Sequence, residues 1–170
     1  HITTPMVTHR KIDDITYIKY KSFHGNAVEK FREALDFAQS QGSKGIIIDL
    51  RDNLGGDLDI MAKTADMILP EGEIFYAMDK NGKRYSEKNS DAAFVDLPIV
   101  ILVNGYSASA SEAFTGAARD FKRAVTVGTK TYGKGIMQTT YTLPNGGAFK
   151  LTTAKYYLPG GECIHKTGIT

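Results

Sequence analysis

The spacing of apolar positions changes along the chain, and each spacing predicts a structural element. Residues 15–20 are rich in β-branched and aromatic side chains, which is typical of a strand. Apolar residues then recur at helical spacing, at Val28, Phe31, Leu35 and Ala38. Residues 45–50 form an apolar run that is typical of a strand buried on both faces. The order strand, helix, strand predicts a parallel βαβ unit with a right-handed crossover.

Capping and stop signals predict where three helices begin and end. We expect Asn26 to cap the first helix together with Glu29, as in a capping box, and Gly42 to end it. A second helix fits residues 57–69, and Pro70 stops it. A third helix is expected from about Ser109 to Phe121.

The remaining apolar runs are strand-sized and are separated by turn residues. They predict a hairpin of residues 73–78 and 84–87, strands at 98–103 and 124–127, a second hairpin of residues 137–143 and 148–153, and a sheet extension at 156–158 before the turn at 159–161. The pattern therefore predicts one α/β domain with two extra hairpins.

Composition narrows the classes of protein that fit this pattern. The chain has 170 residues, 42% of them hydrophobic, and a net charge of +2 that is spread along the sequence, which gives no case for a nucleic-acid partner. No apolar run approaches the length of a membrane span. The single cysteine, Cys163, excludes an intramolecular disulfide and a cysteine-based zinc site, and a structural thiol is its simplest interpretation.

Two loops follow predicted buried strands, at residues 51–56 and 104–109. The carboxyl ends of such strands are where sites form in open α/β sheets. The second loop enters a helix N-terminus, where unpaired N–H groups favour negative charge. Ser109 lies there between two alanines, so it is a candidate nucleophile with oxyanion donors beside it.

A serine nucleophile needs a base, and a lysine is the best placed candidate. None of the four histidines follows a Gly-rich turn that would face the serine: they are His1, His9, His24 and His165. Lys134 lies between two glycines at the start of an apolar strand. Burial can lower the pKa of a lysine by roughly 3–5 units, which makes a neutral amine available. Gln138, four residues further on, is close enough in sequence to orient that amine.

Each of these features also has a purely structural interpretation. Ser109 and Glu112 fit a capping box, and the pair Gly55-Gly56 fits an ordinary turn. Lys134 taken alone fits a surface lysine. Arg51 or Asp52 could bind substrate, although a salt bridge in the loop is the simpler interpretation.

Four motifs, in this order and at this spacing, resemble those of a known protease family. They are residues 45–56 (GIIIDLRDNLGG), 103–112 (VNGYSASASE), 127–135 (VGTKTYGKG) and 151–157 (LTTAKYY). From about Asp14 to Thr170 the chain resembles the catalytic domain of the carboxyl-terminal processing (tail-specific) proteases, the S41 serine peptidases. The resemblance implies an α/β fold of the crotonase and Clp-protease type, with curled sheets, flanking helices and hairpins.

The resemblance also implies roles for individual residues. Ser109 is the implied nucleophile, Lys134 the general base and Gln138 the residue that orients the lysine. The implied oxyanion donors are the main-chain N–H groups of Ala110 and of Gly55 or Gly56. The implied mechanism requires no metal and no cofactor.

The chain departs from the family pattern in two ways. Leu54 stands where the family usually has proline. Members usually carry a PDZ domain before this region, and we expect none here. We therefore expect residues 1–170 to be a single catalytic domain with residues 1–13 as a lead-in, either as an excised core or as a natural minimal form.

The expected function is that of a serine endopeptidase which cuts proteins near their C-termini through an acyl-enzyme. The expected partner is a protein or peptide with an unfolded, apolar C-terminal tail, and a homo-oligomer is compatible with the sequence. The resemblance implies a cell-envelope, periplasmic or exported location. Three alternatives stay open: a non-catalytic module of the same fold that binds peptides or apolar ligands, an acyl-CoA-type enzyme of the crotonase group, and a structural scaffold.

Overall fold

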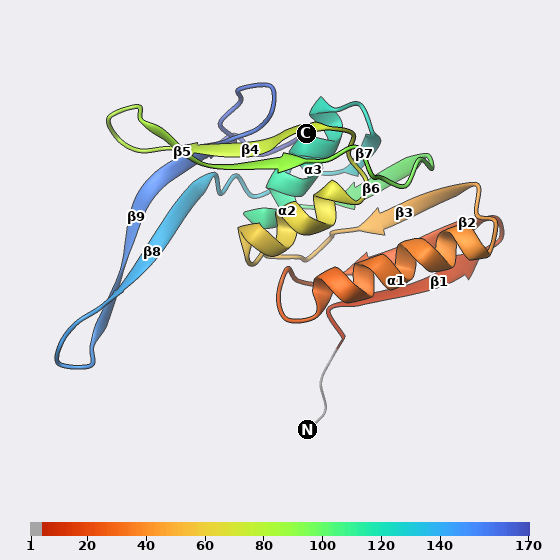
Figure 1. Ribbon diagram of the computed structural model, residues 1–170, viewed down its shortest axis with the longest axis horizontal. Helices are drawn as coiled ribbons and strands as arrows, with labels where there is room; N and C mark the ends of the chain where they lie inside the picture. Colours follow the sequence, from red (N-terminus) through yellow and green to blue (C-terminus); the bar gives the residue numbers. More distant parts are fainter. Residues whose placement is uncertain (1–4) are drawn as a thin grey trace.

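The computed structural model describes residues 5–170, apart from the side chain of Ser86, so His1 lies outside the described residues. The chain forms β1 (Val7–Ile12), β2 (Ile15–Tyr20), α1 (Ala27–Ser40), β3 (Gly45–Asp49), α2 (Leu58–Asp66), β4 (Gly72–Met78), β5 (Arg84–Ser90), β6 (Ile99–Val103), α3 (Ala110–Asp120), β7 (Ala124–Gly128), β8 (Ile136–Thr142) and β9 (Ala148–Tyr157) (Figure 1). These elements build two sheets with helices packed against them, so the predicted α/β class is confirmed.

The first sheet has the strand order β1-β2-β3-β6-β7. Strands β2, β3, β6 and β7 are parallel, which confirms the predicted βαβ unit of β2, α1 and β3. Strand β1 pairs antiparallel with β2 at the edge, within the segment that we expected to be only a lead-in. The pattern gave no signal for β1 because only Val7 of its six residues is buried.

The second sheet has the order β5-β4-β9-β8 and contains both predicted hairpins. Strand β9 is continuous over ten residues, so the two pieces predicted at 148–153 and 156–158 are one strand. The β8–β9 hairpin extends well away from the body of the molecule (Figure 1). Its first residues, by contrast, lie against the body and contribute to the pocket described below.

The ends of α1 show which of its predicted capping residues cap the helix. The predicted capping box at Asn26 is wrong, because its side chain makes no capping hydrogen bond. Gly42 does end α1: it has φ +60°, and its N–H and that of Ser43 bond to the carbonyls of Gln39 and Ala38. This is the Schellman arrangement, which favours glycine.

Helix α2 is shorter than predicted. It ends at Asp66, because the N–H groups of Ile68 and Leu69 both turn back to the carbonyl of Ala65. Its N-terminus is capped by Asp57, whose carboxylate accepts from the N–H groups of Asp59 and Ile60.

The core lies where the helices meet the first sheet. Helix α1 packs on β1 and β2, whereas α3 contacts both β7 of the first sheet and β4 of the second. Four fully buried aromatic side chains join these layers: Tyr20, Phe23, Phe31 and Phe114. Burial of each such side chain contributes about 2–3 kcal/mol, which fixes α3 and therefore its N-terminus. Among residues 5–170, none of the helices combines the length and the apolar character that a bilayer crossing requires.

Candidate active site

The two loops singled out in the sequence meet at the carboxyl edge of the first sheet. Strands β3 and β6 are adjacent and parallel, so the segments that follow them leave the sheet side by side. The N–H of Ala108 donates to the carbonyl of Asn53 at 3.0 Å, and Asn53 itself is fully buried. The two loops are therefore bonded directly to each other.

The three serines of the small-residue run have different environments. Ser107 is fully buried and donates its hydroxyl to the carbonyl of Leu50 at 2.8 Å. Ser111 is also fully buried and donates to the carbonyl of Asn53 at 2.9 Å. Ser109 alone is partly exposed and borders a pocket, described below. Of the three serines, only Ser109 lines this pocket.

The backbone of Ser109 is in an uncommon conformation. Its φ of +57° and ψ of −118° lie outside the regions that serine normally occupies, at a cost of about 1–3 kcal/mol. It stands at the N-cap of α3, directly after the loop from β6. A strained turn between a strand and a helix is the geometry that presents the nucleophilic serine in α/β-hydrolases.

The three expected oxyanion donors differ in whether their N–H groups already have a hydrogen-bond acceptor. The Gly55 N–H already donates to the side-chain oxygen of Asn53 at 2.9 Å, so it is not available to a substrate. Within the described residues, the N–H groups of Gly56 and Ala110 donate to no protein acceptor. Of the expected donors, the N–H groups of Gly56 and Ala110 are therefore those without a protein acceptor, whereas that of Gly55 is occupied.

Gly55 has a different part in this surface. Its φ is +100°, and a Cβ built there would lie 2.6 Å from the Ala108 carbonyl oxygen and 2.9 Å from the Ala110 nitrogen. Both neighbours are backbone atoms that cannot move aside. Glycine at this position allows the two loops to approach closely enough to place Gly56 beside α3.

The loop that carries Lys134 is tied to α3 by a buried carboxylate. Glu112 has no exposed surface, and its two oxygens accept four hydrogen bonds: from the N–H groups of Ser109 (2.9 Å), Gly133 (2.6 Å) and Lys134 (2.8 Å) and from the Thr131 hydroxyl (2.6 Å). Buried charge is tolerated when it is this fully hydrogen-bonded. The sequence indicated Glu112 only as half of a capping box, and its longer-range contacts carried no sequence signal.

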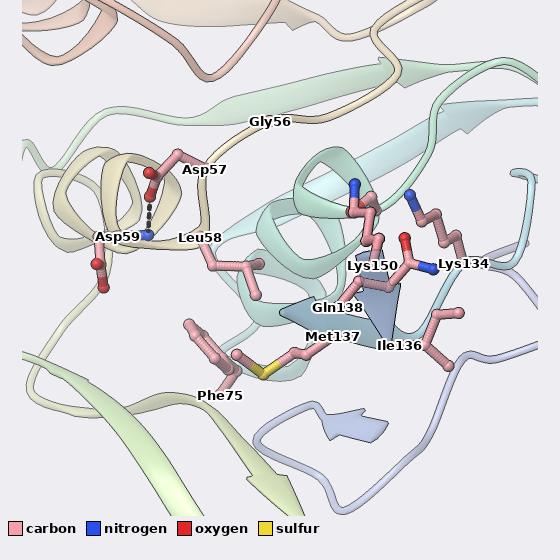
Figure 2. Close-up of a pocket in the computed structure, with 11 residues that line it drawn as sticks. Gly56, Asp57, Leu58, Asp59, Phe75, Lys134, Ile136, Met137, Gln138 and Lys150 are labelled. Carbon is pink, nitrogen blue, oxygen red and sulfur yellow. Dashed lines mark hydrogen bonds between the residues drawn. The ribbon is translucent and has the colours of Figure 1, made fainter. Parts of the chain in front are cut away.

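A pocket of about 330 Å³ brings the candidate side chains together. It is bordered by Gly56, Asp57, Leu58, Asp59, Phe75, Ser109, Lys134, Ile136, Met137, Gln138 and Lys150. In Figure 2 the polar ends of Lys134, Gln138 and Lys150 gather on one side, and Leu58, Phe75 and Met137 lie close together on another. The pocket thus combines a polar wall with an apolar one.

The amine of Lys134 is not joined to the nucleophile candidate in this structure. The Lys134 hydrogen bonds found among residues 5–170 use its main-chain atoms alone. Ser109, Lys134 and Gln138 nevertheless border the same pocket. The pocket also contains Leu58, Phe75 and Lys150, which sequence reasoning missed: Leu58 begins α2 shortly after Gly56, Lys150 lies on β9, across the hairpin from the strand that carries Gln138, and Phe75 comes from β4.

Arg51 is engaged by a buried acid at the end of β3. Its guanidinium donates to both oxygens of Asp49, at 3.0 and 2.7 Å, and Tyr17 donates to the same carboxylate at 2.5 Å. Burial by itself would favour the neutral acid, but the hydrogen bonds from Arg51 and then Tyr17 outweigh it and hold the pKa of Asp49 well below its usual range. The salt-bridge interpretation of Arg51 is confirmed, whereas Asp52 pairs with the amide of Asn104 instead.

A cluster of metal ligands and a cysteine pair are both absent from the described part of the chain. Residues 5–170 contain no cluster of three or more His, Cys, Asp or Glu side chains that could hold a metal ion. Cys163 is partly buried and unbonded to another cysteine.

The match to known proteins agrees with this arrangement. The model of peptidase family S41 matches residues 14–170. The chain belongs to peptidase family S41. It is 41% identical over 155 residues to the carboxyl-terminal-processing protease of Synechocystis sp., covering 91% of this chain and 36% of that protein. It is 38% identical over 158 residues to carboxyl-terminal-processing peptidase 2, chloroplastic, of Arabidopsis thaliana, covering 92% of this chain and 31% of that protein.

A solved S41-type structure has the same fold. The chain superposes on the photosystem II D1 C-terminal processing protease with a TM-score of 0.91 and 29% identity, covering 99% of this chain and 48% of that one. This likeness confirms the fold class that the resemblance implied. The chain spans about a third of the length of these curated relatives and about half of the solved protein.

Proposed function

We propose that this chain is the catalytic part of a serine endopeptidase that cuts proteins near their C-termini. The observation that carries the proposal is Ser109: it is the one partly exposed serine of its run, it has a strained backbone, and it shares a pocket with Lys134. Membership of family S41 supports the reaction class.

In the proposed mechanism the Ser109 oxygen attacks the scissile carbonyl carbon, and the unprotonated Lys134 amine takes the hydroxyl proton. The N–H groups of Gly56 and Ala110 hold the resulting oxyanion, a contribution of about 3 kcal/mol per donor. Lys134 then gives its proton to the departing amine, and the peptide C–N bond breaks to leave an acyl-enzyme. Water attacks the ester, Lys134 accepts the water proton, and that proton returns to Ser109 as the acid product leaves.

Gln138 is proposed to orient the amine during these steps. Its amide lies on the polar wall next to Lys134 and Lys150 (Figure 2). The bond between the amine and Ser109 is proposed to form as substrate fills the pocket, since catalytic hydrogen bonds are often long in the absence of substrate.

The proposed substrate is an unfolded protein or peptide tail that adds beside β8. Strand β8 is an edge of the second sheet, so its main-chain groups on that side are available to pair with an extended chain. Its first residues border the same pocket as Ser109, which supports a substrate path beside that serine. The apolar wall of Leu58, Phe75 and Met137 suits an apolar side chain next to the cut bond.

The proposed setting is the cell envelope, the periplasm or another exported location. The proposal follows from the family resemblance, and one curated relative is named as chloroplastic. Fractionation of cells with an antibody to this chain tests the location, and recovery in the cytosolic fraction alone would contradict it.

The reaction is tested with Ser109→Ala and Lys134→Ala on an unfolded protein substrate. We expect each variant to lose cleavage by at least about 10³-fold, because each removes a group required for bond making. Lys130→Ala, in the same loop and exposed, is the matched control and should cleave normally. Cleavage retained by Ser109→Ala would refute the mechanism.

The same variants separate the proposal from its main alternative, a module that binds peptides without cutting them. An acylating reagent directed at nucleophilic serines should label Ser109 in the unchanged chain and leave Ser109→Ala unlabelled. Binding of a peptide without cleavage or labelling would favour the binding module.

A further inference from the structure

Tyr156 belongs to the fourth sequence motif, which the proposed reaction leaves without a role. Its ring is fully buried, and it stands on β9, the strand between β4 and β8 (Figure 1). Its hydroxyl lies 2.5 Å from the carbonyl oxygen of Lys134 and 3.0 Å from the carbonyl oxygen of Ser109. One phenol thus touches the backbones of both residues of the proposed dyad.

The hydroxyl is a permanent donor at this position. Burial first, and then the charge of nearby Glu112, raise the pKa of Tyr156 well above its ordinary value. The phenol therefore keeps its proton across the pH range in which a protease works, and that proton is shared between the two carbonyl oxygens.

The main chain of Tyr156 adds a third contact on the lysine side. Its N–H donates to the carbonyl of Gly135 at 3.1 Å, so β9 holds two consecutive peptide groups of the loop, those of Lys134 and Gly135. The Glu112 carboxylate accepts hydrogen bonds from the N–H groups of Ser109 and Lys134. The N–H and C=O groups of both residues are therefore bound by the same two side chains.

We propose that Tyr156 is a positioning residue that sets the distance between Ser109 and Lys134 for proton transfer. The inference rests on the proposed function, because it gives Tyr156 its role through those two residues. Tyr156 does not border the pocket and so acts through the backbone alone. Without its hydroxyl, the Lys134 carbonyl loses its partner and the loop shifts relative to α3. A shift of about 1 Å at a reacting group can cost on the order of 10²-fold in rate.

The packing of the ring allows the hydroxyl to be tested separately. Tyr156 meets Phe75 edge to face, with ring centroids 6.4 Å apart, and a phenylalanine keeps this contact. Tyr157 is the matched control: it follows in the same strand, and its ring stacks on Tyr76 with centroids 5.3 Å apart. Tyr157→Phe removes a hydroxyl one residue away without changing the bonds to Ser109 or Lys134.

The experiment compares Tyr156→Phe, Tyr157→Phe and Ser109→Ala in the full chain. The readouts are kcat and KM for a peptide substrate, corrected for the fraction of folded protein, and the acylation rate of Ser109 by a small reagent. For Tyr156→Phe we expect kcat and the acylation rate to fall together by about 10- to 100-fold while KM changes by less than about 2-fold. Tyr157→Phe should match the unchanged chain.

A second measurement separates positioning from simple loss of stability. Replacement of residue 156 by p-aminophenylalanine restores an N–H donor on the same ring, and we expect it to recover most of the lost kcat. If Tyr156→Phe does not fold, this replacement is compared directly with the unchanged chain, and a kcat reduced to the Ser109→Ala level would overturn the inference.

The outcomes distinguish the two proposals. Cleavage that persists in Ser109→Ala refutes the proposed function and the inference with it. Loss of cleavage in Ser109→Ala, combined with a Tyr156→Phe variant that matches Tyr157→Phe, refutes the inference alone. A Tyr156→Phe variant that lowers only the folded fraction, with unchanged kcat per folded molecule, also refutes it.

Discussion

The Ser109 half of the pocket rests mainly on main-chain contacts along one sheet edge, whereas the Lys134 half rests on contacts with segments far away in the chain. On the serine side, short loops from adjacent parallel strands bond directly to each other through Asn53 and Ala108. On the lysine side, the loop before β8 depends on Glu112 of α3 and Tyr156 of β9. The position of Ser109 thus depends largely on the sheet edge, with added contacts from Glu112 and Tyr156, whereas the position of Lys134 depends on those two side chains and on other distant segments.

This difference predicts different responses to mutation. A change in the serine half should disturb folding and chemistry together, because the same backbone contacts serve both. A change in the lysine half should displace the base while the sheets remain intact. Three further experiments, in order of decreasing expected effect, test this distinction.

Gly55→Ala should have the largest effect. Its Cβ would lie 2.6 Å from the Ala108 carbonyl oxygen, and the residue has φ +100°, so both strain and a backbone clash result. We expect a loss of about 3 kcal/mol or more in the free energy of unfolding, together with loss of cleavage. Urea denaturation and a peptide assay measure the two effects.

Gly146→Ala is the control for Gly55→Ala. Gly146 has φ +81°, but a Cβ there would meet nothing within 4 Å. It therefore reports strain alone, which costs about 1 kcal/mol. Equal losses in the two variants would show that the serine half is not closely packed as described.

Glu112→Gln should have an intermediate effect that falls mainly on activity. The amide keeps the size of the side chain, but its NH₂ group would face main-chain N–H donors instead of accepting from them. We expect about 2–3 kcal/mol lost in the free energy of unfolding and about 10²-fold in kcat. A peptide-cleavage assay measures kcat, and thermal unfolding measures the change in stability.

Glu162→Gln is the matched control for Glu112→Gln. Glu162 pairs with Arg119 at 2.6 Å at the surface, where such a pair contributes less than about 1 kcal/mol. A Glu112→Gln variant as active as Glu162→Gln would contradict the role given to the buried carboxylate.

Acidification should have the smallest effect on stability. It should act through Asp49, at the end of β3 on the serine side of the pocket. Because the pKa of Asp49 is held below its usual range in the folded chain, the unfolded chain binds a proton more readily. This contribution to stability is complete above about pH 4 and is lost progressively as the pH falls below that value. Between pH 7 and pH 3 the free energy of unfolding should fall in both proteins. We expect the fall to be about 1–2 kcal/mol smaller for Asp49→Asn than for the unchanged chain.

Asp14→Asn provides the comparison for the acid experiment, because Asp14 forms only an exposed pair with Lys44. Urea denaturation at the two pH values gives the free energies of unfolding. If Asp49→Asn and Asp14→Asn show the same acid dependence, the buried ion pair at the end of β3 does not contribute as described.

Much of this molecule could be predicted from local pattern. The first four residues of β3, 45–48, are apolar, which fits a strand covered on both sides, and Gly42 ends α1 because a residue with positive φ closes that turn well. These signals depend on neighbours in sequence. Strand β1 gave no signal because its side chains are mostly exposed, and its pairing with β2 comes from the main chain.

Part of the candidate site could also be predicted, because some of its residues carry a local sequence signal. The residues Ser109, Lys134 and Gln138 were singled out by type, spacing and family resemblance, and the fold places all three at one pocket. Which of the Gly55 and Gly56 N–H groups is free of a protein acceptor could not be predicted, because it depends on the amide oxygen of Asn53, which accepts from Gly55.

The amino-acid sequence by itself determined the helices, most of the strands, the family and which side chains are available for chemistry. Those properties follow from periodicity and from the kinds of residues in four short motifs. The tertiary structure alone decided which serine of three is accessible, which glycine N–H is unoccupied, and how Glu112 and Tyr156 hold Ser109 and Lys134 together. These are contacts between residues far apart in the chain, and their energies depend on distances of a few ångströms that only packing establishes.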